Sequence, residues 1–196
     1  MTLLTVWPDD RPDHVRLRTE DPTAIATELK RLGVRFERWD VVEDLPREAT
    51  QEQVLAAYRS QIDRVVETEG YQVVDAMRMT PPEDPADPAW AAEAATARQK
   101  FLAEHTHDDD EDRFFARGSG VFYLHVEGHV YAVLCEAGDL LSVPANTTHW
   151  FDMGTRPDYV SVRFFHDDGG WVGNFTGATL SADFPGFDEL AAGRAR

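Results

Sequence analysis

Two histidines and a glutamate in one short stretch constrain this chain more than any other feature of its sequence. His105 and His107 are separated by one residue, and Glu111 follows His107 after three more. Alternate side chains of a β-strand share one face, so a strand running from His105 to Arg113 would present these three groups and a guanidinium together. Two imidazoles and a carboxylate on one face are typical of a metal site.

A fourth candidate ligand is His149, which lies beyond Pro144 after a run of short apolar segments. Three nitrogen donors and one carboxylate without sulfur suit Fe(II), Ni(II), Mn(II) or Co(II), with zinc as a further option. A six-coordinate ion would keep two neighbouring positions for water or a bidentate substrate, which favours a catalytic site over a closed structural one. The remaining histidines lack such partners and are not expected to be ligands: His14, His125, His129 and His166.

The acidity of the chain excludes several kinds of partner. It has 196 residues and a formal net charge of −17, which repels nucleic acids and anionic membranes. Its first residues contain neither a basic start nor a long apolar core, and no later run has the roughly 18 apolar residues of a membrane span. We therefore expect a cytoplasmic protein that binds neither nucleic acids nor membranes. The single cysteine, Cys135, is expected to be a buried strand residue.

In the first hundred residues, apolar periodicity and capping signals predict alternating strands and helices without a catalytic motif. The clearest helix carries a capping box at Thr50 and Gln53. We expect this region to be a scaffold of helices and edge strands packed on the second half of the chain. The predicted elements are a strand over 2–7, a helix over 24–32, a strand over 34–42, a helix over 50–70, a strand over 71–79, a proline-rich break over 81–88 and a helix over 89–99.

After Phe101 the sequence changes to short apolar runs separated by glycine-rich turns, which indicates an antiparallel sandwich or barrel. The proline-rich break could mark a domain boundary, but an extension wrapped on one barrel is more economical. We therefore predict a single domain over 1–196, with a scaffold over 1–100, a metal-binding core over 101–177 and a tail over 178–196 that folds back or frays.

Two motifs resemble those of the cupin superfamily. The first is His105-x-His107-x-x-x-Glu111, followed by six residues and then Gly118, and the second is Gly138, then five residues and Pro144, with His149 beyond. More narrowly, the chain resembles the acireductone dioxygenase family of methionine salvage, densely over 101–177 and only in layout before that. The strings that carry this resemblance are Phe101-Leu-Ala-Glu-His-Thr-His107, Asp110-Glu-Asp-Arg-Phe-Phe115, Phe122-Tyr-Leu-His125, His149-Trp-Phe-Asp-Met-Gly154 and Gly170-Trp-Val-Gly-Asn-Phe-Thr-Gly177.

The resemblance implies a mainly β cupin fold, a double-stranded β-helix or jelly-roll barrel with flanking N-terminal helices. It implies one Fe(II) or Ni(II) per monomer, held by His105, His107, Glu111 and His149. The family binds the enediolate of 1,2-dihydroxy-3-keto-5-methylthiopentene and cleaves it with dioxygen. Its iron form yields formate and 2-keto-4-methylthiobutyrate, whereas its nickel form yields formate, carbon monoxide and 3-methylthiopropionate. The family is largely monomeric.

Two arginines are candidates to balance the charge of a dianionic substrate. A divalent ion that also binds Glu111 keeps only about one unit of positive charge. The resemblance places Arg113 beside the site, with a role in forming or holding the dianion. Arg163 lies between apolar residues of a predicted strand, where an unpaired charge is costly, so a structural ion pair is its alternative role.

The resemblance also assigns roles to three aromatic and two acidic residues. Phe101, Phe151 and Trp171 match aromatic positions that would accept the methylthio tail and exclude water, although each could be plain core. Glu104 and Asp110 match positions associated with metal incorporation and with transmitting local conformational change. A carboxylate could do this by accepting the second N–H of a ligand histidine. The alternative is that this acidic run is a solvated turn.

One position departs from the family pattern. Asn146 stands where the family has glycine, which implies a turn residue with positive φ. Asparagine tolerates this conformation, so we expect the loop before His149 to be preserved.

Two other functions fit part of the pattern. Another metal-dependent cupin enzyme, such as a different dioxygenase or an isomerase, would keep the four ligands without needing both arginines and the aromatic set. A cupin that only binds a metal or small molecule as a sensor is the second alternative. Dioxygen consumption with acireductone separates all three.

Overall fold

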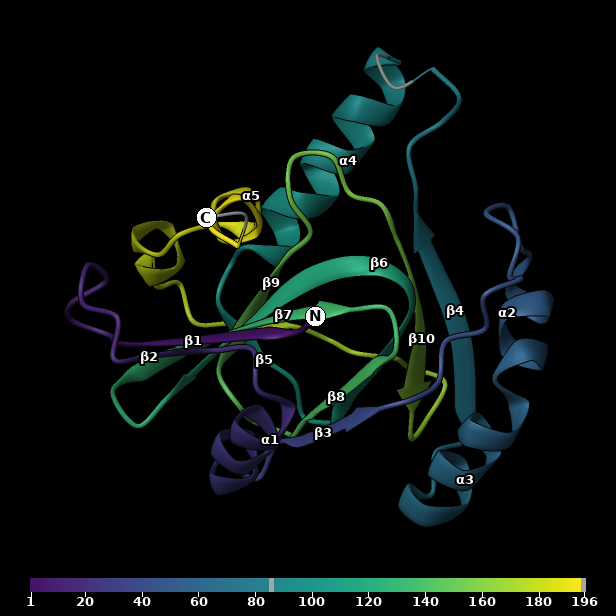
Figure 1. The fold of residues 1–196 in the computed structure, drawn as a ribbon, viewed down its shortest axis with the longest axis horizontal. Helices are drawn as coiled ribbons and strands as arrows, with labels where there is room; N and C mark the ends of the chain where they lie inside the picture. The colour runs from purple at the N-terminus through teal and green to yellow at the C-terminus, as the bar shows by residue number, and fades with distance from the viewer. Residues whose placement is uncertain (85–86, 195–196) are drawn as a thin grey trace.

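The structure is a computed structural model that describes residues 1–84 and 87–194. A β-barrel with helices around it forms its centre, as the mainly β expectation requires (Figure 1). The strands are β1 (Leu3–Pro8), β2 (Leu17–Thr19), β3 (Arg35–Arg38), β4 (Val73–Met79), β5 (His105–Thr106), β6 (Glu111–Val126), β7 (His129–Glu136), β8 (Asp139–Val143), β9 (His149–Asp152), β10 (Tyr159–Phe165) and β11 (Asn174–Phe175). The helices are α1 (Pro22–Arg31), α2 (Gln51–Ala57), α3 (Arg59–Glu69), α4 (Pro88–Phe101), the 3-10 helix η1 (Leu180–Asp183) and α5 (Phe187–Ala192).

Strand β6 belongs to both sheets of the barrel. Its first half pairs with β8 and β10, and its second half pairs with β7 and β9. One sheet therefore has the order β2-β1-β7-β6-β9-β5-β11, and the other has the order β3-β8-β6-β10-β4. These pairings are antiparallel, as the short runs and turns of the sequence predict. β9 pairs with the second half of β6, yet His149 at the start of β9 lies close to Glu111 at the start of β6.

A bend in β6 makes this sharing possible. A shift in the pairing with β10 at Val160 leaves Ala116 as an extra residue in β6, which is a β-bulge. Gly118 follows with a φ of +69°, and a Cβ atom there would lie 1.8 Å from the carbonyl oxygen of Asp158. Glycine is required because no other residue combines this backbone angle with so close an approach.

Capping groups fix where two of the helices begin. The Asp21 side chain accepts hydrogen bonds from two backbone N–H groups in the first turn of α1. Thr50 and Gln53 form the expected capping box at the start of α2. The capping box was readable in the sequence because it is local.

The helix expected over 50–70 is interrupted at Tyr58, where α2 ends and α3 begins. The Tyr58 ring is fully buried and lies against the ring of Phe114, with centroids 4.7 Å apart. Its hydroxyl accepts a hydrogen bond from the backbone N–H of Val42 at 3.1 Å. Packing against the barrel therefore overrides the helical periodicity at this residue.

Side chains that alternate along β6 reach three separate apolar clusters. Phe115 and Phe122 point into the barrel, Phe114 packs with α2 and α3, and Tyr123 packs with η1 and α5. Burial of one large apolar side chain contributes about 1.5–3 kcal/mol. The central strand thus ties the barrel interior to the helices on both of its outer sides.

The first hundred residues contribute barrel strands as well as covering helices. β1 pairs with β7, β3 with β8 and β4 with β10, and β1 lies inside its sheet rather than at an edge. The expected strand over 34–42 is shorter and ends at Arg38, whereas the other elements predicted before Phe101 agree with β1, α1, β4 and α4 within two residues. Of the predicted break over 81–88, residues 85 and 86 lie outside the described residues. The single domain over 1–196 stays a prediction.

The tail over 178–196 folds back onto the barrel as far as residue 194. Phe184 and Leu190 are buried in the same apolar cluster as Trp7 of β1. Residues 195 and 196 lie outside the described residues.

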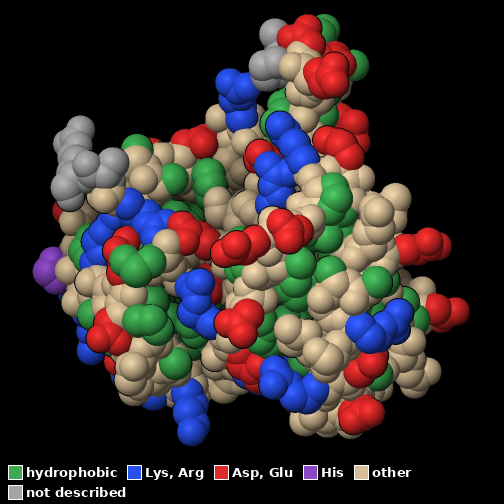
Figure 2. All heavy atoms as spheres, turned by 45° about the vertical axis from the view of Figure 1, so that its right-hand side comes forward, with side chains coloured by type: hydrophobic (Ala, Val, Ile, Leu, Met, Phe, Trp, Pro, Cys, Tyr) green, Lys and Arg blue, Asp and Glu red, His purple; other side chains and the backbone are tan. Residues whose placement is uncertain are grey.

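Charge is mixed on the surface of the molecule. On the face shown in Figure 2, Asp and Glu side chains lie next to Lys and Arg side chains rather than in one acidic field.

Cys135 is fully buried in β7, as expected. None of the described helices combines the length and the apolar character that crossing a membrane requires.

Candidate active site

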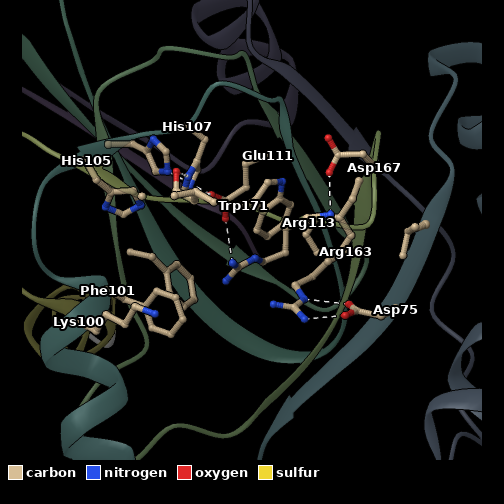
Figure 3. A pocket seen from close by; sticks show the side chains of 18 of the residues that line it. Asp75, Lys100, Phe101, His105, His107, Glu111, Arg113, Arg163, Asp167 and Trp171 are labelled. Carbon is tan, nitrogen blue, oxygen red and sulfur yellow. Dashed lines mark hydrogen bonds and ion pairs between the residues drawn. The ribbon is translucent and has the colours of Figure 1, made fainter.

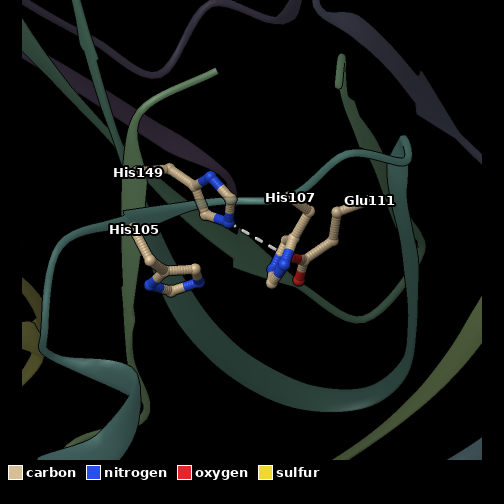
Figure 4. A group of neighbouring side chains, drawn as sticks. All are labelled: His105, His107, Glu111 and His149. Carbon is tan, nitrogen blue, oxygen red and sulfur yellow. Dashed lines mark hydrogen bonds and ion pairs between the residues drawn. The ribbon is translucent and has the colours of Figure 1, made fainter. Parts of the chain in front are cut away.

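The four candidate ligands converge at one end of the barrel, as the sequence predicts. His105, His107, Glu111 and His149 are all buried, and each offers one ligand atom within 4.8 Å of the others (Figure 4). Two of them are direct cross-strand partners, because His105 of β5 pairs with His149 of β9. The Nε2 atoms of His107 and His149 each lie 3.1 Å from the same Glu111 carboxylate oxygen, Oε2.

Hydrogen bonds to backbone carbonyls set the orientation of all three rings. His105 Nδ1 donates to the carbonyl oxygen of Ala103 at 2.7 Å, and His149 Nδ1 donates to that of Thr147 at 2.8 Å. His107 Nδ1 donates to the carbonyl oxygen of Val172 at 2.9 Å. Since a carbonyl oxygen can only accept, each ring carries its proton on Nδ1 and directs the Nε2 lone pair into the cluster. The expectation that carboxylates accept these protons is wrong.

The Glu111 carboxylate stays ionised although it is buried. Burial acts to raise the pKa of Glu111, but the Arg113 guanidinium and the imidazoles of His107 and His149 outweigh burial and hold this pKa well below its usual range. Burial lowers the pKa of His105, which favours the neutral imidazole. Burial also acts to lower the pKa of His107, but the contact with Glu111 raises it overall. An ionised carboxylate and neutral imidazoles are the forms that bind a metal, so a metal ion would displace any proton that Glu111 favours on His107 Nε2.

The single regular strand expected from His105 to Arg113 is wrong. β5 ends at Thr106 and β6 begins at Glu111, with a turn between them. Two hydrogen bonds from the segment before His149 hold this turn: the N–H of Ala145 donates to Asp110 Oδ1 at 2.8 Å, and the N–H of Asn146 donates to the carbonyl oxygen of His107 at 2.7 Å. The ligands therefore converge through long-range contacts and not through the alternation of one strand.

Asn146 has a φ of +62°, as the departure from the family pattern predicts. The N–H of Thr147 bonds to the carbonyl oxygen of Pro144 at 3.1 Å, so Asn146 is the third residue of a tight turn. The loop that leads to His149 is preserved with asparagine in the left-handed position.

Arg113 lies directly beside the cluster, on the side of the cavity. Its Nη2 donates to Glu111 Oε1 at 2.8 Å, and its guanidinium carbon lies 4.7 Å from the ring centroid of Phe151 and 5.5 Å from that of Trp171. The side chain is only 2% exposed. Its Nε and Nη1 atoms have no hydrogen-bond partner among the described residues. Two buried cationic donors without an acceptor are suited to bind an anionic group in the cavity.

Arg163 forms the ion pair that was its alternative role. Its Nε and Nη2 atoms donate to the two carboxylate oxygens of Asp75 on β4, at 2.8 Å and 2.6 Å (Figure 3). Its positive charge is therefore already balanced within the protein. A role of Arg163 in holding the substrate stays a prediction.

A cavity of about 640 Å³ opens next to the ligands and is lined by the three predicted aromatic residues (Figure 3). Phe151 is buried, and Phe101 packs edge-on against it with centroids 6.1 Å apart. The indole N–H of Trp171 donates to the carbonyl oxygen of Asp110 at 3.0 Å, which fixes the ring at the cavity wall. Their contact with the methylthio tail stays a prediction.

Sequence reasoning missed several residues that line this cavity. Lys100, Val172 and Phe175 lie at its wall, and Val172 and Phe175 are 70% and 55% exposed. Phe175 pairs with His105 in the register of β11 and β5. Its place in the string from Gly170 to Gly177 was a signal for it, whereas nothing in the local sequence marks Lys100.

Glu104 and Asp110 do not contact the ligand rings by the hydrogen bonds expected of them. Glu104 is 4% exposed and accepts hydrogen bonds from Thr176 Oγ1 at 2.7 Å and from His125 Nδ1 at 2.9 Å. Asp110 accepts through Oδ1 from the backbone N–H of Ala145. Both carboxylates therefore connect ligand-bearing segments to neighbouring strands and loops. Their effect on metal incorporation or on conformational change stays a prediction.

This donor set fits a divalent metal ion. Donors on neighbouring corners of an octahedron with bonds of about 2.1 Å are about 3.0 Å apart, close to the separations between Glu111 and the two imidazoles. Nitrogen and carboxylate donors without sulfur suit iron, nickel and related ions. The barrel of two sheets with this site at one end defines a metal-binding cupin.

Comparison with known proteins places the chain within that class. Residues 4–173 match the model described as the ARD/ARD' family. The acireductone dioxygenase of Saccharopolyspora erythraea is 62% identical over 194 residues, which cover 99% of this chain and 100% of that protein. The acireductone dioxygenase of Frankia alni is 54% identical over 191 residues, 97% of this chain and 91% of that protein. The chain belongs to the ARD/ARD' family.

A solved structure supports the same assignment. Acireductone dioxygenase from Bacillus anthracis, with a cadmium ion in its active centre, matches this fold with a TM-score of 0.74 and 27% sequence identity, covering 89% of this chain and 98% of that one. The resemblance found in the sequence is therefore confirmed, and so is the cupin fold.

Proposed function

We propose that the protein is a metal-dependent dioxygenase that cleaves acireductone, 1,2-dihydroxy-3-keto-5-methylthiopentene, with dioxygen. The observation that carries this proposal is the buried cluster of His105, His107, Glu111 and His149 beside a cavity that contains the unsatisfied donors of Arg113. Family membership supports it, since the relatives are named for this activity.

The four ligands would hold Fe(II) or Ni(II), one per chain. The bound ion would act as a Lewis acid and template for the two oxygens of the enediolate. We propose that the iron form yields formate and 2-keto-4-methylthiobutyrate and serves methionine salvage, whereas the nickel form yields formate, carbon monoxide and 3-methylthiopropionate. The ligand set supports either ion, because both accept the same nitrogen and oxygen donors.

The residues around the ligands would position and activate the substrate. Arg113 would donate from Nε and Nη1 to a substrate oxygen, which stabilises the deprotonated enediolate next to the ion. Phe151 and Trp171 flank the guanidinium and keep water away from it, so its charge acts through a medium of low polarity. Phe101 extends this apolar wall toward the mouth, where it would accept the methylthio tail.

Metal content and product analysis test the proposal. Protein loaded anaerobically with Fe(II) or Ni(II) is expected to consume dioxygen with acireductone and to form the product set of the loaded ion. His149→Ala is expected to lose both metal and turnover, because one of four buried donors is removed. His14→Ala removes an exposed histidine and serves as the control. Metal-loaded protein that leaves acireductone unchanged would favour another cupin activity, and full metal content in His149→Ala would refute the ligand assignment.

We include two further predictions in this proposal. The protein acts as a monomer and works in the cytoplasm on a small-molecule substrate and dioxygen. Family likeness supports the monomer. Size-exclusion chromatography and cell fractionation test the two statements.

A further inference from the structure

Charged side chains line the cavity in an uneven balance. The carboxylates are Asp75, Glu111, Asp167 and Asp168, and the cations are Lys100, Arg113 and Arg163. Arg113 bonds to Glu111, and Arg163 is paired with Asp75. Two carboxylates, Asp167 and Asp168, and one cation, Lys100, thus have no ion pair with another group among the described residues that line the cavity.

Among the described residues that line the cavity, Lys100 is the one lysine or arginine that has no carboxylate partner. It lies in the last turn of α4 next to Phe101, and its exposed side chain reaches the cavity on the side away from Asp75 and Arg163 (Figure 3). Arg113 lies deep beside the ligands, whereas Lys100 is at the mouth. A dianion that approaches a protein of net charge −17 therefore meets Lys100 before it meets Arg113.

We propose that Lys100 is the anion-capturing residue of the cavity mouth, where it attracts the deprotonated, doubly charged substrate and raises its occupancy of the site. This inference rests on the proposed function and adds a residue to it. Lys100 attracts the substrate from a distance and does not take part in bond cleavage. Asp168, exposed on the loop after β10, acts in the opposite direction by repelling the same anion.

The interaction of a unit charge with a dianion about 8 Å away in a largely aqueous mouth changes binding by about two- to fivefold at moderate salt. Lys100→Gln is expected to raise the KM for acireductone by this factor while kcat stays within about twofold. The difference should shrink as salt is added, because screening weakens an exposed charge. Lys100→Arg, which keeps the charge, should restore the KM.

The chain offers matched controls for both signs of charge. Lys30 is the other of the two lysines in the sequence and lies on α1, outside this cavity, so Lys30→Gln changes the net charge equally and should leave the KM unchanged. Asp168→Asn should lower the KM, whereas Glu67→Gln on α3 should have no effect. Lys100 also lies at the carboxyl end of α4, where a positive charge stabilises the helix. Thermal unfolding of each variant therefore shows whether a change in KM comes from a less stable helix or from weaker attraction of the substrate.

A binding measurement keeps the inference separate from the proposed reaction. Titration of metal-loaded protein with oxalate, a chelating dianion, is expected to give a dissociation constant about two- to fivefold weaker in Lys100→Gln than in Lys30→Gln at low salt. Oxalate binding without turnover of acireductone would overturn the proposed function alone. Equal oxalate affinities in the two variants, a difference that salt does not alter, or no rescue by Lys100→Arg would overturn the role of Lys100.

Discussion

Replacing Arg113 by glutamine should nearly abolish turnover without emptying the metal site. The guanidinium is 2% exposed, uses one N–H on Glu111, and keeps Nε and Nη1 without a partner among the described residues. Glutamine has one amide group and no charge, so it cannot present two cationic donors to a substrate oxygen. The ligand atoms lie on other side chains and are not removed.

The size of the effect follows from the number and setting of these donors. Loss of one preorganised donor to a developing oxyanion lowers kcat by about 10²–10³. We expect the kcat of Arg113→Gln to be lower than that of the unmodified protein by at least this factor. A charge is lost together with two donors, and the site is buried and flanked by Phe151 and Trp171. Breaking a buried ion pair lowers stability by about 3–5 kcal/mol, and metal bound to Glu111 should offset part of this loss.

Steady-state dioxygen consumption with acireductone measures turnover. Metal analysis measures the occupancy of the ligand site, and thermal unfolding measures stability. Arg117→Gln is the control, because Arg117 lies on the same strand but pairs with Asp158 away from the cavity. Arg113→Lys keeps the charge without the fork and should give intermediate activity. Arg163→Gln should lose less activity than Arg113→Gln, because Asp75 already occupies two of its donors. Activity of folded, metal-loaded Arg113→Gln within threefold of Arg117→Gln would refute the charge argument.

Two further predictions concern stability. Burial acts to raise the pKa of Asp152, but bonds from Arg98 and from two backbone N–H groups lower this pKa overall. Asp152→Asn should therefore lower the free energy of unfolding by about 2–4 kcal/mol at pH 7. This difference should begin to shrink as the pH falls below about 4, where aspartate of the unfolded chain is protonated, and should disappear only below the lowered pKa of folded Asp152; a difference independent of pH in denaturant titrations would contradict it. Asn146→Ala should destabilise by about 1 kcal/mol because φ is +62°, whereas Asn146→Gly should stay within about 0.5 kcal/mol in the same assay, and equal values would show that the backbone angle is unimportant.

The ligand set was readable from the sequence because residue type and spacing carry it. The strand geometry behind that reading was wrong, since residues 107–110 form a turn between β5 and β6. This turn depends on hydrogen bonds from Ala145 and Asn146, which lie more than thirty residues away. No local sequence pattern predicts such long-range hydrogen bonds. The left-handed angle of Asn146, in contrast, was predictable because the family has glycine at this position, which implies a turn with positive φ that asparagine tolerates.

Long-range pairing also explains what the sequence left open at the cavity. In the sequence, Arg163 is a charged residue between apolar neighbours, without an evident partner. Only the register of β10 with β4 shows that Asp75 is its direct partner. The break at Tyr58 has the same origin, since the buried ring is held by the barrel and not by its own helix. Lys100 reads as an ordinary last-turn lysine of α4 until the cavity is known.

The orientation of the three imidazoles shows why residue types alone could name the ligands but not their supports. For His105 and His149 the acceptor is the carbonyl two residues earlier in the chain, so the local backbone path orients each ring whatever side chains stand there. For His107 the acceptor is the carbonyl of Val172, and the neighbouring Trp171 donates to the carbonyl of Asp110. Two hydrogen bonds with carbonyl acceptors thus join the segment that carries His107 to the segment of Trp171 and Val172 in the cavity wall. Because any residue supplies a carbonyl, these supports leave no trace in the sequence, and they couple the position of His107 to the wall that would contact the substrate.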